Sequence, residues 1–212
     1  MNRITDNLDA IAAQIQEDFN TKDKTREQVL PLCREVIRHS STAIRAVHRQ
    51  EFEPANKLLK SARKLLDEAE QAAVSYSQLR YTGFFHDAQK EFAEASITLA
   101  LITEKNVPNP DELNISFTAY LNGLGEAVGE LRRYLLDSIR RDDLSRVEEL
   151  LMAMDDIYNI LVTIDFPDAI TGGLRRTTDM VRGILERTRS DLTLVMQQSK
   201  LEKKLKLFEG KF

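Results

Sequence analysis

Apolar positions recur at intervals of three and four residues along nearly the whole chain, which is the period of an amphipathic α-helix. Clear stripes of this kind run between Ile4 and Ile15 and between Leu58 and Ala73. No segment alternates apolar and polar residues as a half-buried strand does, and no repeat or low-complexity segment stands out. The pattern therefore predicts an all-α protein.

Breaks in this pattern predict seven helices within a single domain, residues 1–212. The first helix begins near Thr5 or Asp6 and ends at a polar turn, residues 21–24. Pro31 falls in the first turns of the second helix, which ends near Gln50. The remaining helices are predicted from Pro54 onward and over residues 77–104, 114–141, 144–164 and 171–204, with Thr171 as a cap and the tail after residue 204 frayed. Prolines in residues 106–110 and 165–168 make the breaks.

The composition agrees with an all-α fold and excludes several classes of site and of targeting segment. Hydrophobic residues make up 42% of the 212 residues, charged residues make up 30%, and the net charge is −4. The lone Cys33 excludes an intrachain disulfide and a multi-cysteine zinc site, and its place on an apolar face predicts a core residue. No apolar run is long enough to span a bilayer, and the acidic N-terminus does not resemble a signal peptide. We expect a cytoplasmic protein.

Two pairs of glutamates lie at helical spacing on the fourth and fifth predicted helices. Glu91 and Glu94 share one helix face, and so do Glu126 and Glu130. The segment from Phe92 to Ile102 is apolar on most sides, so it leaves little surface for water. Buried carboxylates are costly unless they are paired, protonated or bound to a cation. If the two helices pack together, the four carboxylates form an oxygen-rich site of the kind that Mg²⁺ or Mn²⁺ prefers.

Small residues surround the second pair. Phe117, Leu121, Leu124, Val128, Leu131 and Leu135 form an apolar stripe, while Ala119, Gly123 and Ala127 lie beside the acids. Gly123, Gly125 and Gly129 each cost the helix roughly 1 kcal/mol relative to alanine, so these three glycines indicate close packing or a ligand near the backbone. A plain helix contact with the acids at its rim explains the pattern equally well. The chain has no Glu-x-x-His motif of the ferritin-like di-iron type, but the all-helical nucleotide pyrophosphatases remain a rival.

Four arginines form a basic stripe on the second predicted helix. Arg34, Arg38, Arg45 and Arg49 fall within about 60° of one another around the helix axis, over roughly 22 Å. No acidic residue interrupts that face, so guanidinium groups without local partners are expected there. Such a stripe suits phosphate backbones. An ordinary solvated face, or salt bridges between subunits, is the other interpretation.

Three segments together resemble the translin/Trax family, most closely its archaeal Trax-like proteins. Residues 90–95, KEFAEA, resemble the Trax segment with two catalytic glutamates. Residues 117–143 resemble the family's long helix, with the pattern Y-L-x-G-x-x-x-x-x-G-E-L, and residues 174–194 resemble its C-terminal helix. The resemblance covers most of the chain and is strongest from Glu91 to about Leu194.

The resemblance implies a seven-helix fold that assembles into a closed homo-oligomeric shell, commonly an octamer. It also implies a Mg²⁺- or Mn²⁺-dependent endoribonuclease that cleaves single-stranded RNA through water activated at carboxylate-bound metal. Glu91, Glu94 and Glu130 match the family's acids, whereas Glu126 stands where Trax has an aspartate, which lengthens that side chain by one methylene. These four glutamates are the predicted catalytic and metal-binding residues. The predicted nucleic-acid-binding residues are Arg34, Arg38, Arg45, Arg49, Arg80, His86 and Lys90.

Aromatic side chains near the first glutamate pair are candidates for base stacking. Tyr81 and Phe84 fit that role, and Phe85 fits the core better. The alternative function is a non-catalytic shell that binds single-stranded RNA or DNA, as translin does. A helical scaffold whose acids pair with arginines of neighbouring subunits is a further alternative.

Overall fold

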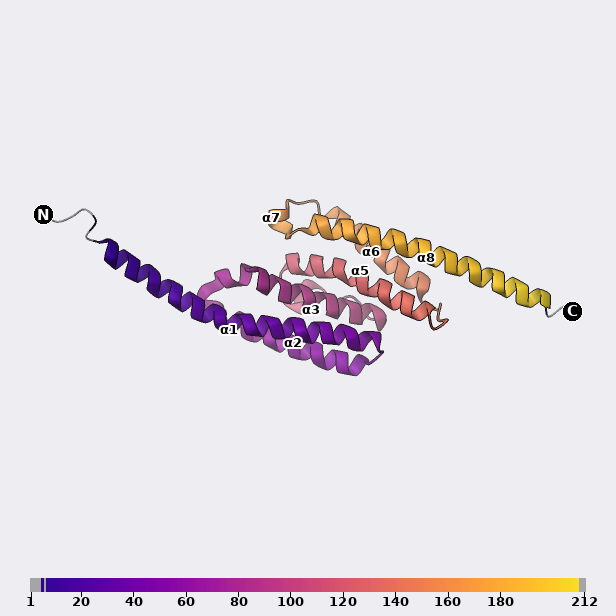
Figure 1. The fold of residues 1–212 in the computed structure, drawn as a ribbon, viewed down its shortest axis with the longest axis horizontal. Coiled ribbons are helices and arrows are strands. Elements are labelled where there is room, and N and C mark those ends of the chain that lie inside the picture. Colours follow the sequence, from indigo (N-terminus) through magenta and orange to yellow (C-terminus); the bar gives the residue numbers. More distant parts are fainter. Residues whose placement is uncertain (1–4, 6, 210–212) are drawn as a thin grey trace.

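The protein is described here by a computed structural model covering residue 5 and residues 7–209. The secondary structure of that part is entirely helical and forms nine segments (Figure 1). In chain order these are α1 (Leu8–His48), α2 (Phe52–Ala72), η1 (Val74–Tyr81, a 3₁₀ segment), α3 (Gly83–Ile102), α4 (Pro110–Leu113), α5 (Phe117–Ile139), α6 (Val147–Thr163), α7 (Asp168–Thr171) and α8 (Leu174–Glu209). The prediction of an all-α fold is confirmed.

Two helices occupy the centre of the molecule. α3 packs against α1, α2 and α5, while α5 packs against α3, α6 and α8. Figure 1 accordingly shows α1 and α2 on one side, α6 and α8 on the other, and α3 and α5 between them. The apolar character of α3 on most sides follows from this position, because neighbours cover it on several faces. α3 and α5 therefore form the central helix pair, and the two pairs of glutamates lie on these two helices.

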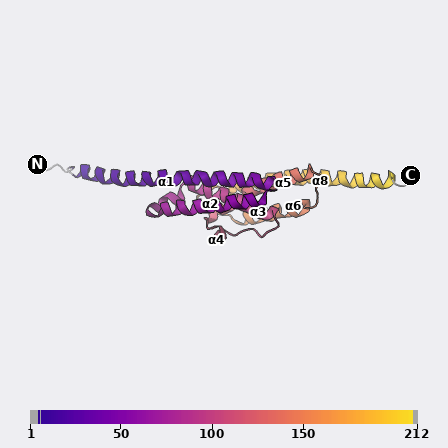
Figure 2. The same ribbon diagram turned by 90° about the horizontal axis from the view of Figure 1, so that it is seen from below.

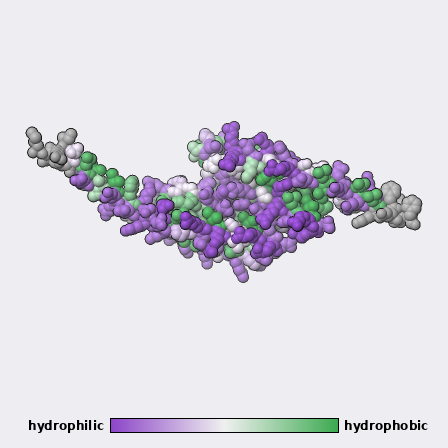
Figure 3. Space-filling model, viewed as in Figure 1, coloured by the Kyte–Doolittle hydropathy of each residue, from purple (hydrophilic) through white to green (hydrophobic). Residues whose placement is uncertain are grey.

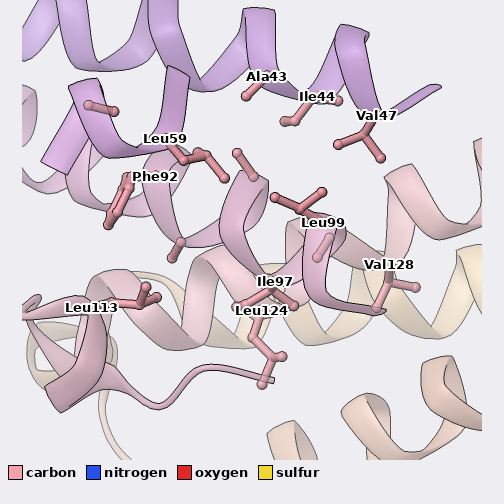
Figure 4. Packing of buried hydrophobic residues seen from close by; sticks show 14 of the residues in the cluster. Ala43, Ile44, Val47, Leu59, Phe92, Ile97, Leu99, Leu113, Leu124 and Val128 are labelled. Atoms are coloured by element: carbon pink, nitrogen blue, oxygen red, sulfur yellow. The ribbon is translucent and has the colours of Figure 1, made fainter. Parts of the chain in front are cut away.

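A continuous set of apolar side chains fills the space between these helices (Figure 4). Val47 from α1, Leu59 from α2, Ile97 from α3 and Val128 from α5 all contribute to it. Cys33 is completely buried, as predicted, and burial raises the pKa of its thiol to about 12. Phe85 also belongs to the core, as predicted. Phe117, at the start of the predicted stripe on α5, is instead 68% exposed, because the stripe meets its neighbours only from the next turn onward.

The predicted turn at residues 21–24 is wrong. Those residues continue α1, so the first two predicted helices are one helix of 41 residues, with Pro31 in its interior. The segment is polar but contains no glycine or proline to end a helix, and Thr21 and Thr25 donate hydrogen bonds to carbonyls four residues earlier. Ile4 and Asp6, which belong to the predicted start, lie outside the described residues. The frayed tail predicted after residue 204 is wrong for residues 205–209, which continue α8, and residues 210–212 lie outside the described residues.

Other predicted boundaries shift for identifiable reasons. The segment predicted as one helix from residue 77 is divided between η1 and α3, and Tyr76 has non-helical dihedral angles. Thr171 ends α7 rather than capping the last helix, because Gly172 and Gly173 both adopt positive φ angles and separate α7 from α8. The break at residues 106–110 is confirmed, and Asn109 there forms a capping box at the start of α4.

α1 and α8 both extend beyond the body of the molecule. Figures 1 and 2 show the N-terminal part of α1 leaving one end of the body and the C-terminal part of α8 leaving the opposite end. No helix in the described part of the chain is long and apolar enough to cross a membrane.

Candidate metal centre

Close packing of α3 on α5 brings the two glutamate pairs together. Gly123 makes this possible, since a Cβ atom there would lie 2.7 Å from both the Ala93 Cβ and the Lys90 carbonyl oxygen. The backbones of the two helices therefore touch one turn before Glu126. This is the small-residue contact that the glycines of α5 indicated, and Ala119 and Ala127 on the same face are also completely buried.

Three of the four predicted carboxylates converge. Glu91, Glu94 and Glu126 each offer an oxygen, and these oxygens all lie within 4.8 Å of one another. Glu130 is not part of that group, because its Oε2 accepts a hydrogen bond of 2.5 Å from His48 Nε2 at the end of α1. The Arg133 guanidinium lies 3.8 Å from the same oxygen. The structure thus brings together three predicted ligands and pairs the fourth with a histidine.

The environments of these acids differ sharply. Burial first, and then the charges of Glu91, Glu126 and Glu130, raise the pKa of Glu94 to about 8. Burial also raises the pKa of Glu91, although the Lys90 ammonium opposes this shift. The hydrogen bond from His48 lowers the pKa of Glu130 despite its partial burial. Without a cation, the fold therefore disfavours the ionised form of Glu94 most and favours the ionised form of Glu130.

Lys90 is the cation already present at the site. Its Nζ donates a 2.7 Å hydrogen bond to Glu126 Oε1. Burial disfavours the ammonium, but the bond to Glu126 and the charges of Glu91 and Asp87 more than compensate, so the pKa of Lys90 is raised. One ammonium offsets only part of the charge of three clustered carboxylates. The donors are all oxygen atoms, which is the chemistry that Mg²⁺ and Mn²⁺ select, so the residues fit a hard divalent cation.

A hollow of about 680 Å³ opens beside Glu126 and Lys90. Arg176 and Thr177, near the start of α8, also line this hollow. Asn122 of α5 joins this helix to the start of α8 and to the end of α7. It accepts a 2.7 Å hydrogen bond from Thr177 and donates one of 3.1 Å to the Thr171 carbonyl. The hollow beside the acidic cluster is therefore lined by both Glu126 and Arg176.

A second hollow, of about 600 Å³, adjoins the first and shares His86 and Gly172 with it. Arg80 and Tyr81 line this second hollow, and Tyr81 is 89% exposed. His86 Nε2 is buried and has no hydrogen-bond partner. Of the predicted nucleic-acid-binding residues, Arg80, His86 and Lys90 thus line a groove made of these two adjoining hollows, which Glu126 also lines.

The arginine stripe lies on a different surface. All four side chains are exposed, in agreement with a solvent-facing stripe, but the expected lack of local partners is wrong for three of them. Arg38 pairs with Glu35 one turn earlier on α1, and Arg45 donates a 2.8 Å hydrogen bond to Thr42 Oγ1. Arg49 donates hydrogen bonds of 2.8 and 3.1 Å to Glu51. Glu35 lies close enough around the helix to reach Arg38, and the turn into α2 brings Glu51 back to Arg49. A role for the stripe in binding nucleic acid stays a prediction.

The sequence did not single out His48, Asn122 or Arg176 as site residues. His48 follows the buried Ile44 and Val47 on α1, and this place on the edge of an apolar face was a weak signal for a buried partner. Its actual partner is 82 residues away. Arg176 reaches the groove only because α8 packs across α5, which no local pattern shows.

Several known proteins are similar to this chain. A protein of Methanocaldococcus jannaschii that carries no functional description is 32% identical over 191 residues, which is 87% of this chain and 82% of that protein. AfC3PO in complex with duplex RNA is 31% identical with a TM-score of 0.80, over 88% of this chain and 97% of that one. AfC3PO alone gives 32% identity and the same TM-score over the same shares. No family model matches the chain.

Apo-NeC3PO supports the fold alone. It is 18% identical, with a TM-score of 0.77 over 92% of this chain and the whole of that one. The all-α fold shared with these structures, with carboxylates on the central helices α3 and α5, is that of a translin-type subunit. The chain shares 31–32% of its aligned residues with AfC3PO over most of the length of both proteins, which shows that it belongs to the translin/Trax family.

Proposed function

We propose that this protein is a Mg²⁺- or Mn²⁺-dependent endoribonuclease acting on single-stranded RNA. The observation that carries the proposal is the convergence of Glu91, Glu94 and Glu126, with Glu94 held where its charge is strongly disfavoured. Burying a carboxylate beside two half-buried ones costs free energy, and carboxylates with strongly perturbed pKa values cluster at functional sites. The likeness to AfC3PO, which was solved with duplex RNA, supports RNA as the class of substrate.

Each residue of the site has a distinct role in this proposal. Glu91, Glu94 and Glu126 hold the cation, and His48 fixes the carboxylate of Glu130 beside them. A divalent ion at such a site acts as a Lewis acid, favouring ionisation of water and stabilising charge on a phosphate. Lys90 offsets part of the negative charge of the site, and Arg176 across the hollow binds a phosphate of the strand.

We expect Glu91→Ala to abolish metal-dependent cleavage while leaving the fold and the assembly intact, because this half-buried side chain contributes a ligand rather than core volume. The measurement is cleavage of a labelled single-stranded RNA with Mn²⁺, with Mg²⁺ and with EDTA. Glu68→Ala, at an exposed position on α2 that lines neither hollow, serves as the control. Cleavage by Glu91→Ala at the wild-type rate would refute the site.

The alternative is a shell that binds single-stranded RNA or DNA without cleaving it. The ion pair of Lys90 with Glu126 and the hydrogen bond of His48 to Glu130 favour it, because both acids already have partners within the chain. RNA binding in EDTA with no cleavage under any metal condition would select this alternative.

Arg176 and its neighbour Arg175 allow a matched test of the groove. Both are exposed, but Arg176 faces the hollow beside the acids, whereas Arg175 lines a separate hollow with Asp165 and Phe166. We expect Arg176→Ala to weaken RNA binding in EDTA by roughly tenfold and to reduce its salt dependence by about one ion, as loss of one phosphate contact does. Arg175→Ala should change neither quantity. Equal effects of the two substitutions would show that the strand does not follow this groove.

A further inference from the structure

A further hollow, of about 490 Å³, follows the C-terminal half of α5. Its lining residues all belong to that helix, and they are Gly129, Arg132, Arg133, Leu136, Asp137 and Arg140. Three guanidinium groups and one carboxylate give this arginine hollow a net positive charge. Figure 3, in the orientation of Figure 1, shows mainly hydrophilic residues over the middle of the body, so this side of the molecule offers charge rather than a continuous apolar face.

One of the three arginines already has partners within the chain. Arg132 donates a 2.9 Å hydrogen bond to Thr188 Oγ1 and one of 2.7 Å to Asp191 Oδ2. These bonds join α5 to α8. Arg132 therefore adds positive charge to the arginine hollow, but its guanidinium group is not free for a ligand.

The guanidinium groups of the other two arginines are free. Those of Arg133 and Arg140 donate no hydrogen bond within the described part of the chain, and the two side chains are 54% and 83% exposed. The carboxylates nearest to them are Glu130, at 3.8 Å from Arg133, and Asp137, at 3.7 Å from Arg140. Both separations exceed the length of a hydrogen bond, so each guanidinium group can bind an incoming anion.

The arginine hollow continues the face of α5 that carries the acids. Glu126 and Glu130 and the two free arginines fall within about 80° around the helix axis, and they span about 21 Å along it. The groove beside Arg176 is lined by Glu126, and the arginine hollow is lined by residues C-terminal to Glu126, so the two follow one another along α5. The acids of α5 thus lie between two surfaces that carry arginines.

The chemistry of the arginine hollow suits the phosphates of one strand. Guanidinium groups bind phosphate oxygens through paired hydrogen bonds, and Arg133 and Arg140 present two such groups about 10.5 Å apart along one helix face. The dipole of α5 gives a purely structural reason for a cation at Arg140, which is the C-cap. It gives none for Arg133, because the effect of the dipole is confined to the last turn.

We propose that Arg133 and Arg140 bind phosphates of the same RNA strand that Arg176 contacts, on the opposite side of the acids. This inference rests on the proposed function for its substrate, and it adds a second phosphate-binding surface to that site. A strand held on both sides of the acids presents an internal phosphodiester bond to them rather than a chain end. Cleavage within a strand requires this arrangement.

Arg140 and its neighbour Arg141 allow a test in EDTA, where binding is measured without cleavage. Both are exposed, but Arg141 lines neither the groove nor the arginine hollow. We expect Arg140→Ala to weaken binding of a labelled single-stranded RNA roughly tenfold and to lower the slope of log K against log salt by about 0.7. Arg141→Ala should change neither quantity. Wild-type affinity in Arg140→Ala, or an equal loss in the two variants, would overturn the proposal.

Combining Arg140→Ala with Arg176→Ala tests whether one strand makes both contacts. Contacts made by one strand should give losses of affinity that multiply, while the number of strands bound per chain stays the same. If separate strands occupied the two surfaces, each substitution would lower that number instead, and the proposal would fail. A protein that binds RNA as expected but cleaves none would refute the nuclease alone, whereas unchanged binding by Arg140→Ala would refute the role of the arginine hollow alone.

Discussion

Glu94→Gln is expected to make the protein more stable when no metal is present. The unfolded carboxyl has a pKa near 4.5, whereas burial first, and then the neighbouring acids, raise the pKa of Glu94 to about 8 in the folded protein. The folded state therefore binds this proton more tightly than the unfolded state does. As pH rises from about 4.5 to 8, the wild type progressively loses stability, and it loses no more above pH 8.

The size of this effect follows from the shift. Each unit of pKa corresponds to about 1.4 kcal/mol, so Glu94→Gln should gain roughly 3 kcal/mol at pH 7 and up to about 5 kcal/mol at pH 8, with little gain below pH 4.5. The measurement is chemical unfolding in EDTA across this pH range. Glu68→Gln, at an exposed position on α2, is the matched control and should show no such pH-dependent gain.

The same substitution should remove the response to metal. A divalent ion at 100 times its dissociation constant stabilises a fold by about 2.7 kcal/mol, and the wild type should show such a shift with Mn²⁺ or Mg²⁺. Binding should tighten as pH rises toward 8, because Glu94 must lose its proton to act as a ligand. Glu94→Gln should show neither the metal shift nor RNA cleavage. A variant that is less stable than the wild type at pH 8 in EDTA would contradict the assigned environment of Glu94.

Gly123→Ala is expected to destabilise the protein even though alanine favours helix. The new methyl group would meet the Lys90 carbonyl oxygen and the Ala93 Cβ at 2.7 Å, and neither can move without moving the α3 backbone. Overpacking of this kind costs about 1–3 kcal/mol, more than the gain in helix propensity of up to about 1 kcal/mol. The helices that carry Glu94 and Glu126 must also separate, so the stabilisation by Mn²⁺ should weaken.

Gly129→Ala provides the control on the same helix. A Cβ there meets only Ile184 Cδ1 at 3.9 Å, which is an ordinary contact. This variant should gain roughly 0.5–1 kcal/mol from helix propensity and keep its response to metal. Thermal unfolding of both variants, with and without Mn²⁺, measures the difference. If Gly123→Ala were as stable as the wild type and were stabilised by Mn²⁺ to the same extent, the close contact of α3 and α5 would not be what positions the metal ligands.

The sequence by itself determined the helical nature of the chain and the residues of the candidate centre. The period of apolar positions gave the all-α fold, because helix packing requires apolar residues three and four positions apart. The spacing of Glu91 and Glu94 placed both on one helix face, and the glycines around Glu126 indicated close approach of another element. These inferences rest on interactions within one or two turns of helix, which local sequence contains.

Only the tertiary structure decided which distant residues meet. It continued α1 through the polar residues 21–24, where sequence indicated a turn, because a helix without a breaking residue persists when nothing else competes. It gave Glu130 a partner in His48 and brought Arg176 to the hollow that Glu126 lines. It also left apolar side chains exposed on the protruding ends of α1 and α8. A local pattern shows that a helix face is apolar, but its burial depends on where the other helices pack.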